Sequence, residues 1–92
     1  MYRIKQYTLQ KAKQLGVRVR PSTLKHKKID VFNSVGKKIS SVGYRGMMDY
    51  PSYIESKGRS YASKRRKLYY IRHSKDGLTK GSNGWYAKKL LW

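Results

Sequence analysis

A run of basic and aromatic residues between positions 64 and 73 is the part of the chain best suited to contact a ligand. Its members are Lys64, Arg65, Arg66, Lys67, Tyr70, Arg72 and His73. Ammonium and guanidinium groups bind phosphate oxygens, and tyrosine rings pack against sugars and bases. These residue types at this density favour contact with a polyanion. The alternative is a solvated helix face whose tyrosines belong to the core.

Helical periodicity divides this segment into two faces. At about 100° per residue, one arc is expected to face the core and holds Tyr61, Ala62, Leu68 and Tyr69. The opposite arc is expected to face outward and holds Ser63, Arg66, Lys67 and Tyr70.

Arg65 and Arg72 project into the apolar arc, where each needs a carboxylate, a carbonyl or a partner. The nearest acids in sequence are Asp49 and Glu55. Two expectations stay open. Either one arginine pairs internally while the other covers apolar surface with its stem, or both arginines face an adjacent subunit.

The charge of the whole chain points to the same kind of partner. Its 92 residues include 23 lysines and arginines against four acids, a formal net charge of +19. Solubility of a small domain needs a net charge of only about 2–8, so an oppositely charged partner is the better explanation. Lysine pairs at 27–28, 37–38 and 88–89 spread this charge over every element rather than along one stripe. That distribution favours acidic neighbours on several sides, or nucleic acid bound without sequence preference.

The sequence predicts no enzyme, cofactor or metal site. Cysteine is absent, and His26 and His73 do not suffice for a structural metal centre. The four acids include no pair placed for acid–base catalysis, and no glycine-rich segment matches a phosphate-binding loop. No apolar run approaches the roughly 18 residues of a membrane span. We therefore expect a non-enzymatic protein made in a reducing, soluble compartment.

The elements that position these groups indicate a small single α+β domain, in which one β-hairpin packs with three or four short helices. The N-terminal part, 1–26, is expected to hold a helix over 1–16 and an extended segment over 17–20, with Thr8 as the helix N-cap and Gly16 as its stop. The hairpin occupies 27–44, a helical part 47–74, and a polar loop with an aromatic C-terminal anchor 75–92.

The hairpin is predicted around the loop 34–36, with Gly36 in the left-handed conformation and Asn33 paired with Lys37. Continuing that register places Val31 opposite Ile39, Ile29 opposite Ser41 and Lys28 opposite Val42. One face of the ribbon would then hold Ile29, Val31 and Ile39, and the other Phe32, Val42 and Tyr44.

Signals for helix ends follow the hairpin. Asp49 or Tyr50 is expected to cap a helix that has Pro51 near its first position. Gly58 interrupts it, and a second helix is expected from Ser60. The closing GWYAKKLLW segment is expected to form a short helix or an extended anchor. Its rings either complete the core or serve as interface anchors, namely Trp85, Tyr86 and Trp92.

Several segments together resemble a family of small, basic proteins encoded by nucleocytoplasmic large DNA viruses of algae and amoebae. These segments are KKIDVF, GKKISSVGYRGMMDYPSYI, KRRKLYYIRH and GSNGWYAKKLLW. The family more often carries an acid or amide where this chain has Lys88. The resemblance implies a virion component, made in the host cytoplasm, that lies under the capsid shell or near packaged DNA or the inner membrane.

The first hypothesis is therefore a non-enzymatic structural protein of a large DNA virus particle, a minor capsid or internal component. Its basic surface would contact acidic surfaces of other capsid proteins. The alternative is a non-specific DNA-binding protein that assists condensation or packaging of the viral genome. A third hypothesis places the basic face on anionic lipid of an inner viral membrane, which liposome flotation would test.

Overall fold

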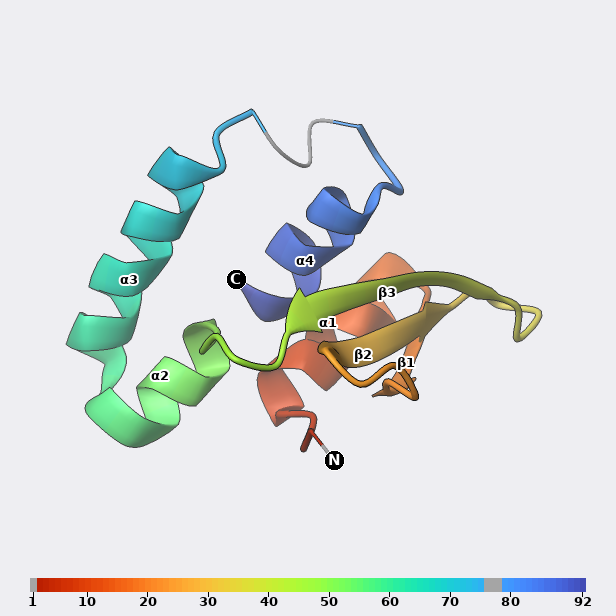
Figure 1. Ribbon diagram of the computed structural model, residues 1–92, viewed down its shortest axis with the longest axis horizontal. Coiled ribbons are helices and arrows are strands. Elements are labelled where there is room, and N and C mark those ends of the chain that lie inside the picture. Colours follow the sequence, from red (N-terminus) through yellow and green to blue (C-terminus); the bar gives the residue numbers. More distant parts are fainter. Residues whose placement is uncertain (1, 76–78) are drawn as a thin grey trace.

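Helices from both ends of the chain pack onto a three-stranded antiparallel sheet in the computed structural model, which describes residues 2–75 and 79–92 (Figure 1). The elements in chain order are α1 (Gln6–Leu15), β1 (Arg18–Pro21), β2 (Lys27–Phe32), β3 (Lys38–Tyr44), α2 (Tyr50–Lys57), α3 (Arg59–Arg72) and α4 (Asn83–Leu91). The predicted small α+β fold is confirmed. Part of the predicted polar loop, 76–78, lies outside the described residues.

The sheet has the order β1-β2-β3. The extended segment predicted after the first helix is its edge strand β1, which pairs antiparallel with β2 and sets Val19 opposite Val31. Buried Asp30 of β2 contacts both neighbouring segments, because its carboxylate accepts hydrogen bonds from Oγ of Ser22, which follows β1, at 2.6 Å and from Ser41 Oγ of β3 at 2.7 Å. Burial by itself would raise the pKa of Asp30, but the hydroxyl donors and Lys38 outweigh burial and lower it.

The loop of the hairpin agrees with the prediction. Gly36 has a φ of +85°, and the Asn33 amide donates to the Lys37 carbonyl at 2.9 Å. The predicted register still holds where Phe32 pairs with Lys38. It is wrong from Val31 onward, because Val31 pairs with Ser40 and not with Ile39. One residue of β3 therefore lies unpaired in a β-bulge.

The bulge changes which side chains reach the core. Ile29 is opposite Val42 rather than Ser41, so Val42 joins Ile29 and Val31 in the core. Ile39, predicted to be on the buried face, is 40% exposed. A shift of one residue in a strand exchanges its two faces, which explains the exchange of Ile39 for Val42.

The core lies between the sheet and the two terminal helices. It consists of Ala12, Ile29, Val31, Val42, Tyr86, Leu90 and Leu91. Thr8, predicted to cap α1, instead lies buried one turn inside it and donates from Oγ1 to the Leu90 carbonyl at 2.8 Å. Lys5 is the N-cap residue and makes no side-chain cap, while Gly16 ends the helix with a φ of +73°, as predicted. Thr8 thus joins the two terminal helices instead of starting one.

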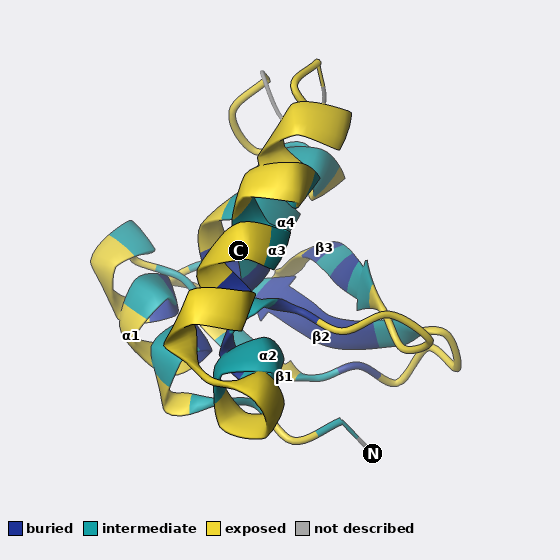
Figure 2. Ribbon diagram, turned by 90° about the vertical axis from the view of Figure 1, so that its left-hand side faces the viewer, coloured by how far each residue is buried: buried dark blue, intermediate teal, exposed yellow. Residues whose placement is uncertain are grey.

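Helix α3 is the most exposed helix of the domain, as Figure 2 shows by its largely yellow ribbon. Ala62 is fully buried, but Tyr61 and Leu68 are 43% and 42% exposed. The prediction that Tyr61 and Leu68 are core residues was wrong. Helix α3 packs mainly on α2, so no layer of the sheet covers its other faces. Arg66, predicted to face outward, lies with its guanidinium 4.1 Å from the centre of the Tyr50 ring.

Gly43 in β3 offers a test of the packing between sheet and α4. Its φ is +83°, and an added Cβ would lie 2.7 Å from Leu91 Cδ1. We expect Gly43→Ala to lower the free energy of unfolding by about 2–5 kcal/mol, the sum of left-handed backbone strain and overpacking. Gly36→Ala is the matched control, because its φ is +85° but nothing lies within 4 Å of the new methyl group. The control should lose only about 1–2 kcal/mol. Urea unfolding followed by circular dichroism measures both, and equal losses would contradict the packing argument.

Candidate functional site

A cleft of about 740 Å³ lies between α3 on one side and β3 and α4 on the other, where Figure 1 shows α3 standing opposite α4. Its basic lining residues are Lys27, Lys28, Arg65, Arg72, His73 and Lys75. Its aromatic lining residues are Tyr44, Tyr53, Tyr69 and Trp92. The cleft therefore combines positive charge with ring surface.

Helices α2 and α3 hold one wall of this cleft. The Asp49 carboxylate caps α2 by accepting from the Ser52 amide at 3.0 Å, and Pro51 lies in the first turn, as predicted. Gly58, with a φ of +88°, separates α2 from α3. The local sequence signals for both helix starts are therefore confirmed, with α3 beginning at Arg59, one residue before the expected Ser60.

Stacked rings connect α3 to the C-terminal helix. The Tyr69 and Trp92 rings lie 4.2 Å apart between centroids and are 5° from parallel. Tyr53 of α2 adds a tilted contact with Trp92 at 6.2 Å, and His73 lies 4.4 Å from Tyr69. Aromatic contacts of this kind contribute about 0.5–1.5 kcal/mol each beyond the burial of area. The rings form a continuous wall along the cleft.

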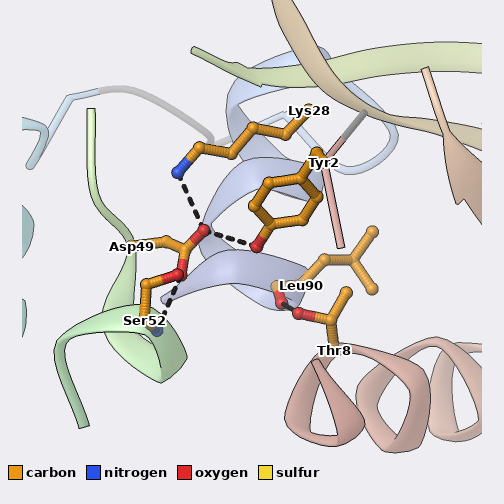
Figure 3. Close-up of polar contacts among 6 residues, drawn as sticks. All are labelled: Tyr2, Thr8, Lys28, Asp49, Ser52 and Leu90. Atoms are coloured by element: carbon orange, nitrogen blue, oxygen red, sulfur yellow. Dashed lines mark hydrogen bonds and ion pairs between the residues drawn. The ribbon is translucent and has the colours of Figure 1, made fainter. Parts of the chain in front are cut away.

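A polar cluster around Asp49 adjoins the cleft, which Lys28 and Asp49 also line (Figure 3). Lys28 Nζ lies 2.8 Å from Asp49 Oδ2, and the Tyr2 hydroxyl donates to the same oxygen at 2.7 Å. Burial disfavours the ionised Asp49 carboxyl, but the hydrogen bond and charge of Lys28 outweigh it and lower its pKa. Burial and the bond to Asp49 raise the pKa of Tyr2. The Lys28 charge is thus neutralised inside the protein.

Lys27, Arg65, Arg72 and Lys75, which also line the cleft, form no ion pair with a carboxylate of the described residues. Among the lining residues that the structure describes, Asp49 is the sole acid, and its carboxylate is already paired with Lys28. Glu55 pairs instead with Lys5 at 3.0 Å and with Arg3 at 3.7 Å. Neither of the two acids nearest in sequence therefore pairs with Arg65 or Arg72. The Arg65 guanidinium lies 5.6 Å from the centre of the Tyr53 ring, so its charged group faces an aromatic surface.

The predicted contact residues do not form one surface. Arg65, Arg72 and His73 line the cleft. Lys64, Lys67 and Tyr70 are exposed elsewhere on α3, and Lys67 and Tyr70 border a shallow depression together with Arg66. The charge of Arg66 also partly offsets the burial that raises the pKa of Tyr7.

The three predicted interface anchors also lie in different parts of the structure. Trp92 lies in the wall of the cleft, Tyr86 is buried in the core, and Trp85 is half-buried beside the core. Lys27 and Lys75 belong to the cleft but were not predicted as contact residues. Lys27 lies in one of several lysine pairs and Lys75 in a polar loop, so no local signal distinguished them from the other lysines.

In residues 2–75 and 79–92, no group of three or more His, Cys, Asp or Glu side chains could hold a metal ion. The same described part of the chain contains no helix with the length and apolarity to cross a membrane. No protein-family model matches the sequence, and neither a curated protein nor a solved structure is significantly similar to it.

Proposed function

We propose that this protein is a non-enzymatic, nucleic-acid-binding component of a large DNA virus particle. The observation that carries the proposal is the cleft, in which Lys27, Arg65, Arg72 and Lys75 converge without a carboxylate among the described lining residues to neutralise them. Charges gathered in this way repel one another until an anion occupies the space between them. The location in a virus particle is supported by the sequence resemblance.

Nucleic acid is the polyanion that fits this lining best. Its phosphates are bound by lysine and arginine, and its bases and sugars pack on aromatic rings. An acidic protein surface would bind the cations but would make no use of the aromatic residue Trp92 that lines the same cleft. The net charge of +19 supplies attraction at longer range, which accelerates association and does not depend on base sequence.

A second function, contact with other capsid proteins as a minor capsid component, is favoured by a different surface. Tyr61, Leu68 and Ile71 on α3 are 43%, 42% and 62% exposed. They recur at helical spacing among lysines, and exposed apolar strips of this kind often bind proteins. A virion component can use both surfaces, the cleft for nucleic acid and the strip for a neighbouring subunit.

The dependence of binding on salt tests the proposed function. If about four phosphates are neutralised, log K should fall with log salt at a slope near −0.7 per contact for a single strand, so affinity falls about 50-fold between roughly 50 and 200 mM salt. Fluorescence anisotropy of a labelled oligonucleotide with the full chain measures this, and polyglutamate serves as a competitor of similar charge. Absence of binding near 50 mM salt, or displacement by polyglutamate at equal charge concentration, would contradict the proposal and favour the contact with acidic capsid proteins.

A further inference from the structure

We infer that the cleft accommodates a single strand of nucleic acid rather than a duplex, and that Trp92 stacks against one of its bases. The inference rests on the proposed function and adds the class of ligand. It starts from the lining of the cleft, where four aromatic residues accompany the cations. Cations alone would suit any polyanion, whereas rings select a ligand that exposes flat surfaces of its own.

A duplex does not offer such surfaces. Its bases are stacked on one another, so a protein meets only their edges in the grooves and the phosphates outside. A single strand exposes the faces of its bases, and proteins that bind it without sequence preference combine a basic groove with aromatic stacking platforms. The cleft has both features on one surface.

Trp92, backed by Tyr69, is placed to serve as this platform. The two rings are stacked with one another, yet both residues are only partly buried and both line the cleft. A base stacked on the Trp92 ring would extend the existing stack without displacing a core residue. Arg72 and Lys75, which end and follow α3 and are exposed, are available for the phosphates on either side.

The size of the cleft agrees with a short stretch of single strand. A volume of about 740 Å³ falls in the range of sites that enclose small molecules, roughly 300–1,000 Å³. A duplex could contact only the rim of a recess of this size, and its stacked bases would not reach the Trp92 ring.

Intrinsic fluorescence tests the stacking directly. Trp85→Phe leaves Trp92 as the only tryptophan of the chain, since the sequence contains two. Oligothymidine of about 12 nucleotides should quench the emission of Trp92 at saturation, whereas a duplex of the same length at the same salt should leave it nearly unchanged. Equal quenching by both ligands, or none by oligothymidine that anisotropy shows to be bound, would overturn the inference.

Affinity of variants supplies the second test. Trp92→Leu should weaken binding of oligothymidine by about 5- to 150-fold, the loss expected for one stacked base, and Trp92→Phe should restore most of it. Phe32→Leu is the control, because this ring lies on the sheet outside the cleft. Circular dichroism establishes that each variant is folded. Failure to bind any nucleic acid would refute the proposed function itself. Binding of both forms with equal affinity, unaffected by Trp92→Leu, would refute only the preference for a single strand.

Discussion

Asp49→Ala is expected to lower the free energy of unfolding by about 4–6 kcal/mol, which is most of the stability of a domain of this size. The carboxylate is 1% exposed and has three separate partners, Lys28, Tyr2 and Ser52. Its removal leaves the Lys28 ammonium buried without a counter-charge, which costs about 3–5 kcal/mol of stability. It also removes the N-cap of α2, which costs about 1 kcal/mol. Thermal and urea unfolding followed by circular dichroism measure the loss.

Two controls separate the buried ion pair from carboxylates in general. Glu55→Ala removes an acid whose side chain is 57% exposed, and it should change stability by less than about 1 kcal/mol. The double variant Asp49→Asn with Lys28→Met removes both charges and keeps a capping side chain, so it should recover much of the stability lost in Asp49→Asn alone. Similar losses in Asp49→Ala and Glu55→Ala would contradict this account.

The same ion pair makes stability depend on acid pH. The folded pKa of Asp49 is lowered from an ordinary value of 3.8, so its contribution is fully present above that value and is lost as pH falls through the lower folded pKa. Asp30 is lowered in the same direction and adds to the effect. Tyr2 acts at the opposite end, since its raised pKa means that stability is lost as pH rises beyond its ordinary value of 10.0. Stability should therefore be nearly constant around neutral pH, and Asp49→Asn should flatten the acid side.

Reversal of two charges in the cleft is expected to have the largest effect on binding. Arg72→Glu with Lys75→Glu should weaken the affinity for oligothymidine by at least about 100-fold, because charge-assisted hydrogen bonds contribute about 1.5–3 kcal/mol each and are replaced by repulsion. The slope of log K against log salt should become shallower by the contribution of about two phosphate contacts, each roughly −0.7 for a single strand. Helix α3 loses only a favourable charge near its C-terminus, worth about 0.3–1 kcal/mol of stability.

A matched variant distinguishes the cleft from overall charge. Arg18→Glu with Lys37→Glu makes the same change in net charge at two exposed residues near the far end of the sheet from α3 (Figure 1). Both proteins should therefore share the long-range attraction and differ only in the cleft. The matched variant should lose affinity a few-fold. Equal losses in the two variants would mean that binding follows net charge and not the cleft.

The sequence determined the features whose causes are local. Gly16 and Gly36 adopt the left-handed conformations expected of them, and Asp49 caps α2 as predicted. The chemistry of a cap or a turn lies within three or four residues, so a single segment contains all of it. The α+β class followed for the same reason, because periodicity and turn residues define each element separately.

Register and burial depended on contacts between elements. The bulge in β3 puts Val42 in the core with Ile29 and leaves Ile39 partly exposed. Simple alternation had placed Ile39, and not Val42, on the same face as Ile29. Helical periodicity identified Ala62 as buried but could not show that Leu68 has no covering layer. Burial of a side chain depends on its own segment and on the element that covers it, and the sequence of one segment describes only the first of these.

The basic run at 64–73 was recognised from the sequence as a site of contact, but only the tertiary structure decided which of its members act together. Arg65, Arg72 and His73 share the cleft with Lys27 and Trp92, which lie far from them in the chain. Lys28 leaves the set of available cations because folding buries it against Asp49. Net charge is additive along a sequence, whereas a binding site depends on which charges converge and which are already neutralised, and these are set by long-range packing.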